Sequence, residues 1–239
     1  MIRPLRDILF IDLETVSATE YLHELSEARQ QAWQMKAEQL QSEGLGGSAD
    51  DLYQQQGGLH AEFGRIVALT VGYFHEREEG PELRVKTYTS FDSEKSLLDA
   101  FQALLDERFD QKTLRLCAHN GKEFHIPFLC RRMLVHCVPL PPVLNFAGKK
   151  PWEVPHLDTA EMWMFGNRRY PVSLFTLCSL FTIPYQKHAG GTELHHTFYK
   201  LEDIDQITQW SQQDVIATAQ LYLRYRCEST LPEEKIILV

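Results

Sequence analysis

A short apolar run that carries two carboxylates on one side constrains the fold most. Residues 7–13 read DILFIDL, and Glu14 and Thr15 follow. A run so rich in Ile, Leu and Phe predicts a buried β-strand. Because side chains alternate between the two faces of a strand, Asp12 and Glu14 point to the same side, whereas Leu13 points into the core. Buried carboxylates are costly unless a cation joins them, so the pair is a candidate divalent-metal site; a hydrated strand end is the alternative.

Two later segments carry groups that suit the same chemistry. Residues 118–128 read AHNGKEFHIPF and pass from a predicted strand into a helix through Asn120 and Gly121. Taken alone, this is a glycine-assisted turn with an incidental histidine. In the last predicted helix, Trp210 and Asp214 lie four residues apart and share one face. Taken alone, that helix is amphipathic, with a packed Trp and a solvated Asp, so only the three segments together favour a common site.

The hydrophobic pattern predicts an α/β chain with a mixed sheet. We expect one domain over residues 1–239, because the sequence has no internal repeat and no Pro-rich or Ser-rich linker. The loosest stretch, residues 42–50, is expected to be a loop. Ser93 is a candidate helix cap. The predicted strands span 7–13, 65–74, 83–88, 114–118 and 155–158, and the predicted helices span 20–41, 93–109, 123–136, 172–181 and 205–226.

Composition excludes several classes of protein. No apolar run approaches the roughly 18 residues that a membrane helix needs, so we expect no membrane span. Residues 1–7 lack the apolar core of a secretion signal. The five cysteines form no CxxC pair and no zinc-like spacing. Such scattered cysteines indicate reduced thiols, and we expect a cytoplasmic protein.

The net charge of −9 is unevenly distributed. Residues 20–62 hold eight acidic and two basic residues, whereas residues 115–170 hold eight basic and four acidic ones. The acidic segment is therefore an improbable contact for a polyanion, and the basic segment a suitable one. Catalysis does not explain the predicted helix over 20–41, which carries Trp33; a lid, a homodimer contact and a cover for the sheet all remain open.

Taken in this order, the motifs resemble those of the DEDD superfamily of 3′–5′ exonucleases. More narrowly, the chain is similar to a bacterial family of predicted exonucleases related to the proofreading domain of family B DNA polymerases. The resemblance spans about residues 8–226 and implies a ribonuclease H-like mixed β-sheet flanked by helices, with a helical insertion at about 20–62. Further matching segments are AEFGRIV (61–67), GKKPWE (148–153), HLDT (156–159), MWMFG (162–166) and TAQLYLR (218–224).

The resemblance implies a catalytic site with two divalent ions, Mg²⁺ or Mn²⁺. Asp12 would bridge the ions, while Glu14 and Asp214 complete the site of the attacking water. The chain departs from the family pattern at two catalytic positions: His125 stands where the family has an aspartate, and Trp210 where the tyrosine subclass has a tyrosine. The second ion is the less supported one, because a neutral imidazole brings no charge and suits transition metals better than Mg²⁺. An indole also offers only an N–H donor where a hydroxyl orients water.

The implied partner is the 3′ end of a single-stranded DNA or RNA. Leu13 and Thr15 would meet its last nucleotide. Basic side chains in the middle segment would contact phosphates, and aromatic ones would stack on bases. The remaining candidate contacts are Asn120, Phe124, Arg131, Arg132, Lys149 and Lys150.

Two functions follow from the resemblance. The first is a metal-dependent 3′–5′ exonuclease, weakened by His125 and Trp210. The second is a catalytically degenerate protein of the same fold that binds nucleic acid or a protein partner. An Mg²⁺-dependent phosphatase and a structural scaffold are further alternatives, but neither predicts all three motifs in this order.

Overall fold

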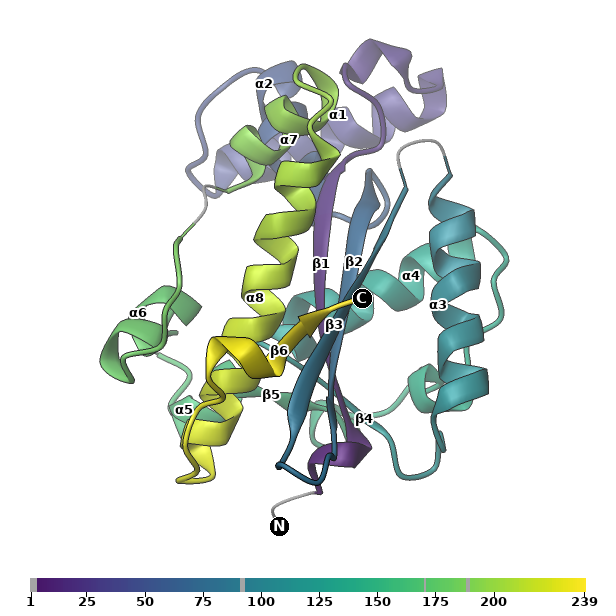
Figure 1. Ribbon diagram of the computed structural model, residues 1–239. Helices are drawn as coiled ribbons and strands as arrows, with labels where there is room; N and C mark the ends of the chain where they lie inside the picture. The colour runs from purple at the N-terminus through teal and green to yellow at the C-terminus, as the bar shows by residue number, and fades with distance from the viewer. Residues whose placement is uncertain (1–3, 91–92, 170, 188–189) are drawn as a thin grey trace.

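A six-stranded mixed sheet forms the centre of the structure, in the order β5–β4–β1–β2–β3–β6 (Figure 1). The structure, a computed structural model, describes the whole chain except residues 1–3, 91–92, 170 and 188–189. The first three strands, β1 (Ile8–Ser17), β2 (Gly64–His75) and β3 (Glu82–Thr89), form an antiparallel meander. The other three, β4 (Arg115–Ala118), β5 (Leu157–Asp158) and β6 (Ile236–Leu238), pair in parallel with their neighbours.

Helices cover both faces of this sheet. Helix α8 (Ile204–Tyr225) lies on one face, and α3 (Glu94–Arg108) and α4 (Ile126–Val135) lie on the other (Figure 1). The alternation of β1 explains this arrangement, because Phe10 packs with Val215 of α8 whereas Ile11 packs in the cluster of α3 and α4. The predicted fold class, an α/β mixed sheet flanked by helices with a ribonuclease H-like arrangement, is confirmed. Within the described ranges, no helix combines the length and the apolar character of a membrane span.

Helix α8 approaches the sheet very closely at one glycine. A Cβ atom on Gly72 of β2 would lie 2.6 Å from Cγ1 of Val215. Real Cβ contacts are not that short, so only glycine allows this approach of helix and strand. The consequence is that the residues of α8 beside Val215 stand next to the polar side chains of β1.

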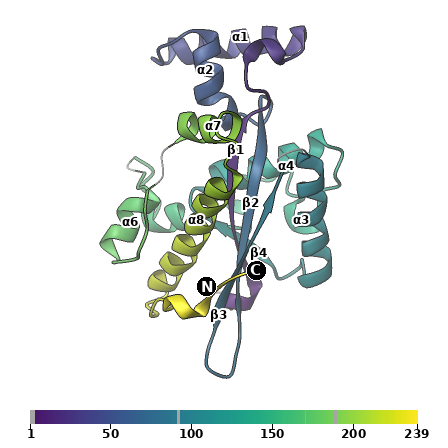
Figure 2. The same cartoon turned by 45° about the horizontal axis from the view of Figure 1, so that its top comes forward.

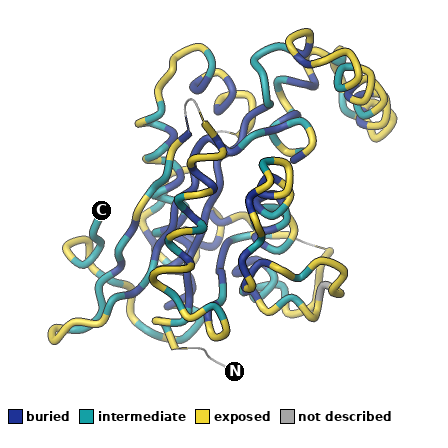
Figure 3. The backbone as a smooth tube through the Cα atoms, turned by 90° about the vertical axis from the view of Figure 1, so that its right-hand side faces the viewer, coloured by how far each residue is buried: buried dark blue, intermediate teal, exposed yellow. Residues whose placement is uncertain are grey.

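The chain between β1 and β2 forms α1 (Glu27–Ser42) and α2 (Ala49–Gln56), which lie beyond the end of the sheet near α7 (Gly191–Tyr199) (Figure 2). The stripe that α1 buries consists of Trp33, Ala37 and Leu40. Trp33 is fully buried, and its indole N–H donates to the Ala49 carbonyl at 2.8 Å. Trp33 therefore holds α1 to α2 and is not available to a partner protein. Exposed residues line the outer sides of the helices, whereas the central strands are buried (Figure 3).

The sequence located the long elements and some short ones, such as β4 and β5, but missed others. Strand β1 is longer than predicted because its pairing with β2 continues to Ser17, with a bulge between Glu14 and Thr15. The helix predicted at 20–41 begins at Glu27, and the one predicted at 123–136 begins at Ile126 after a π-helical turn, η4 (Gly121–His125). The cap expected at Ser93 is confirmed, since its side chain accepts from the Ser96 N–H. Helix α6 (Leu174–Leu180) was expected, but α2, α5 (Thr159–Met164), α7 and β6 were not.

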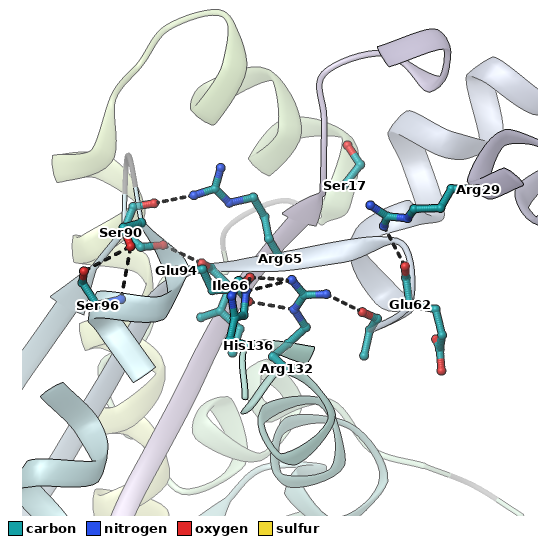
Figure 4. A network of polar contacts seen from close by, with 12 residues as sticks. Ser17, Arg29, Glu62, Arg65, Ile66, Ser90, Glu94, Ser96, Arg132 and His136 are labelled. Atoms are coloured by element: carbon teal, nitrogen blue, oxygen red, sulfur yellow. Dashed lines mark hydrogen bonds and ion pairs between the residues drawn. The ribbon is translucent and has the colours of Figure 1, made fainter. Parts of the chain in front are cut away.

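A buried ion pair joins α3, α4 and the start of β2 (Figure 4). Glu94 accepts hydrogen bonds from the Ile66 N–H at 2.8 Å and from Nε and Nη2 of Arg132 at 2.9 and 2.6 Å. Arg132 also donates to the Ala61 carbonyl at 2.8 Å, and His136 Nε2 lies 2.7 Å from Glu94 Oε2. Both charged side chains are thus buried with several partners, which offset the cost of their desolvation.

Replacing Glu94 by alanine is expected to destabilise the fold strongly, by about 3–5 kcal/mol, because the buried Arg132 loses its counter-charge. Urea unfolding followed by circular dichroism measures the loss. The matched control is Asp99→Ala, which breaks the exposed Lys95–Asp99 pair of the same helix and should cost no more than about 0.5 kcal/mol. Equal losses in the two variants would contradict a stabilising role for the buried pair.

Candidate active site

Three carboxylates gather where β1 faces α8. Asp12 and Glu14 lie on the face of β1 that α8 covers, and both are almost completely buried, at 6% and 8% exposure. Asp214 precedes Val215 on α8, at the closest approach of this helix to the sheet. The alternation of a strand and the tight packing of one helix therefore bring together groups that are about 200 residues apart in the sequence.

Glu14 experiences the charge of the other two carboxylates. Burial is the main reason why the pKa of Glu14 is raised well above its usual range, and the negative charges of Asp12 and Asp214 raise it further. The charges of these three acidic side chains, two of them buried, repel one another when all are ionised. A divalent cation relieves both the repulsion and the desolvation, so the donor set fits such an ion.

The two aspartates also have partners within the protein. Ser211 Oγ donates to Asp12 Oδ2 at 2.8 Å, and His125 Nε2 lies 3.2 Å from Asp12 Oδ1. The hydroxyl of Tyr185 donates to Asp214 Oδ1 at 2.7 Å. Burial and then the charge of Asp214 raise the pKa of Tyr185, so this hydroxyl keeps its proton and acts as the donor. Within the described residues, no three His, Cys, Asp or Glu side chains are already arranged around one point as metal ligands.

His125 reaches Asp12 from the end of the π-helical turn after β4. Asp158 fixes this turn, because its carboxylate accepts from the N–H groups of Asn120 and Lys122, both at 3.0 Å, and also caps α5. Gly121 is required in the turn, since a Cβ there would lie 2.6 Å from that of Ala118. Asp158 is thus a supporting residue that the sequence analysis did not single out, although its position in the HLDT segment was noted.

Trp210 lies one turn before Asp214 but faces an apolar cluster. Its ring packs against a group of buried residues at the other end of β1 and α8: Val16, Val67, Ala68, Leu194, Phe198 and Ile207. The indole brings no hydroxyl to the carboxylates, and the hydroxyls found there belong to Ser211 and Tyr185. Sequence reasoning missed both, since neither residue stands at a spacing that singles it out.

The residues expected to contact nucleic acid do not form one surface. Leu13 is buried in the core on the opposite face of β1, and the Thr15 hydroxyl donates to the Gly58 carbonyl at 2.7 Å. Arg132 is buried in the ion pair with Glu94, so its guanidinium is not accessible to a phosphate, and this part of the expectation is corrected. Phe124 packs partly on the core, with its ring 5.2 Å from that of His125.

The other candidates border a cavity of about 700 Å³ beside the π-helical turn. Asn120, Arg131 and Lys149 line it, together with apolar residues of α4 and of the loop that follows. Lys150 lies next to the cavity in sequence, with its ammonium 5.3 Å from the centre of the exposed Trp152 ring. None of Asp12, Glu14 and Asp214 lines this cavity. Its lining also includes Glu123, Asp158 and Glu161, so the cavity carries charges of both signs.

Comparison with protein families gives one match of three quarters of the chain. The model described as "Predicted 3'-5' exonuclease related to the exonuclease domain of PolB" matches residues 58–236. The matched region contains His125, Trp210 and Asp214 but begins after Asp12 and Glu14. Exonucleases of this kind usually use divalent metals. No curated protein matches the chain.

Without divalent metal, the stability of the protein is expected to fall as pH rises above the ordinary carboxyl pKa of about 4.5 toward the raised pKa of Glu14. In this window the folded protein keeps a proton that the unfolded chain has released, so the free energy of unfolding decreases with pH. Glu14→Gln should remove this loss and raise the melting temperature near neutral pH, with little effect at pH 4. Thermal unfolding with a chelator measures both proteins; identical pH profiles would contradict this account of the site.

Proposed function

The chain belongs to the family of predicted 3′–5′ exonucleases related to the exonuclease domain of PolB, and from this premise we propose that it is a metal-dependent exonuclease that shortens single-stranded nucleic acid from its 3′ end. The observation that supports the metal-dependent part best is the placement of Asp12 and Glu14, both buried, beside the half-buried Asp214 at the contact of β1 with α8. The pKa of Glu14 is raised by its burial and by its two acidic neighbours, and a donor set of this kind is suited to hold a hard cation.

The three carboxylates would hold Mg²⁺ or Mn²⁺, which when bound activates a water molecule and stabilises negative charge on the phosphate. Ser211 and His125 hold the two oxygens of Asp12 in place. The other ring nitrogen of His125, Nδ1, is buried and has no hydrogen-bond partner among the described residues. The His125 ring therefore fixes Asp12 but adds no negative charge for a second ion.

The cavity beside Asn120 is the proposed path of the strand away from the carboxylates. Arg131 and Lys149 would contact phosphates there, which sets affinity but not sequence preference. The exposed ring of Trp152, with Lys150 beside it, would stack on an unpaired base. Such stacking favours a single strand over a duplex.

The second candidate function is nucleic-acid or partner binding without turnover. The contacts of the aspartates favour it, because His125 and Ser211 already occupy both oxygens of Asp12, and Tyr185 occupies one oxygen of Asp214. Carboxylates with such partners are stable without a cation. The two functions differ in one measurable respect, which is cleavage.

A 5′-labelled single strand incubated with the protein and Mn²⁺ is expected to give a ladder of 3′-shortened products on a denaturing gel. Asp12→Ala should abolish the ladder, because Asp12 is central to the proposed metal site. Asp50→Ala, which removes an exposed carboxylate of α2 far from the site, should leave the ladder unchanged. A native protein that binds the strand but gives no ladder would overturn the proposal in favour of binding without turnover.

Restoring the family residues should increase cleavage. His125→Asp adds a fourth carboxylate beside Asp12, and His125→Asp with Trp210→Tyr adds a hydroxyl one turn before Asp214. We expect the rate with Mg²⁺ to rise in His125→Asp, and the double variant shows whether a hydroxyl at position 210, where the native ring packs on an apolar cluster, adds to it; a well-positioned catalytic group is worth about 10²–10⁴-fold. Rates from single-turnover assays in Mg²⁺ and in Mn²⁺ test this. No gain in either metal would show that positions 125 and 210 do not limit the native protein.

A further inference from the structure

Tyr185 belongs to none of the motifs, yet its hydroxyl lies in the carboxylate site. It follows α6 in the connection to α7, and its ring packs with residues of α6 and α8. Phe175 lies beside it, with 6.5 Å between the ring centres. Ile183, which is 5% exposed, anchors the same segment two residues earlier. The ring is thus held from several sides, and its hydroxyl has a defined place.

The Tyr185 hydroxyl donates a hydrogen bond of 2.7 Å to Oδ1 of Asp214. A hydroxyl that donates to an ionised carboxylate makes one of the stronger hydrogen bonds in proteins, and a distance of 2.7 Å is compatible with such a bond. It fixes the rotation of a carboxylate that stands at the edge of the buried site, where α8 alone leaves the side chain more freedom. Asp12 is fixed in a similar way from the other side, by Ser211 and His125.

We propose that Tyr185 is a positioning residue of this site, whose hydroxyl orients Asp214 for the binding of a divalent cation between α8 and β1. The inference rests on the proposed metal-dependent function. Outer hydrogen-bond partners of metal ligands orient them, and their loss typically costs 10–100-fold in metal affinity. Tyr185 would act through Asp214 and not on the substrate.

A second tyrosine provides a matched control. Tyr225 of α8 packs in the same apolar cluster as Tyr185, and its hydroxyl donates to the Thr159 carbonyl at 3.2 Å. Tyr225→Phe therefore removes the same atom from the same surroundings without touching a carboxylate. Any loss that arises merely from a missing hydroxyl in this cluster will appear in both variants.

The test is the affinity for Mn²⁺ alone, measured on the full chain from the electron paramagnetic resonance signal of the free ion. Tyr185→Phe should bind Mn²⁺ about 10–100-fold more weakly than native protein, and Tyr225→Phe should bind it as native protein does. In an Asp214→Asn background, Tyr185→Phe should have no further effect, because the group it orients is gone. Circular dichroism confirms that each variant is folded.

Equal affinity in native protein and Tyr185→Phe would overturn the inference, and so would an equal loss in the two phenylalanine variants. Either result leaves the proposed exonuclease standing if the 3′ ladder is observed. Native protein that binds no Mn²⁺ would overturn both the inference and the metal dependence of the proposed function. A further loss on Tyr185→Phe in the Asp214→Asn background would show that Tyr185 acts through another group, which also overturns it.

Discussion

The placement of three carboxylates between one strand and one helix, with Asp12 and Glu14 buried and Asp214 half-buried, is the constraint on which the rest of the site depends. A buried carboxylate loses several kcal/mol of hydration unless hydrogen bonds or opposite charge replace it. The fold holds Asp12, Glu14 and Asp214 together because Gly72 lets α8 approach the sheet. The surrounding groups then compensate for the burial. Ser211, His125 and Tyr185 come from three different elements, and each directs a polar atom at an aspartate.

A second buried acidic residue, Glu94, shows how the same protein compensates for the burial of a carboxylate that has a structural role. Glu94 is as buried as Asp12, but a guanidinium, an imidazole and a backbone N–H surround it, and Arg132 supplies a full opposite charge. The pKa of Glu14, in contrast, is raised by burial and by its negative neighbours. One site is balanced within the fold and stabilises it. In the other site, the carboxylate of Glu14 has negatively charged neighbours, and a perturbed pKa of this kind is typical of functional sites.

The sequence predicted features that depend on neighbouring residues, but it did not predict contacts between residues far apart in the chain. The strand that carries Asp12 and Glu14 and the helix that carries Asp214 follow from local periodicity, and a motif order joined them correctly into one family. Tyr185 could not be found in this way, because its link to Asp214 spans 29 residues and depends on how the segment after α6 packs. Arg132 was misread for a similar reason: a pair of arginines on a helix suggests a basic surface, but one of them turns inward to Glu94. The predicted cap at Ser93 is local, and it was right.

The residue at position 125 affects the proposed metal site through its charge as well as through its contact with Asp12. Three ionised carboxylates carry a charge of −3, so one divalent ion leaves the site at −1 and two leave it at +1. With a fourth carboxylate, the net charge of the site with two divalent ions bound would be zero. An uncharged imidazole in that place leaves the net charge at +1. His125 lies beside Asp12, with 3.2 Å between Nε2 and Oδ1, and contributes no negative charge there. An approaching phosphodiester brings a negative charge of its own, which balances the extra positive charge only while it is bound. Under the proposed function, a second ion would therefore bind together with the substrate rather than before it, and occupancy of the site would depend on the nucleic acid.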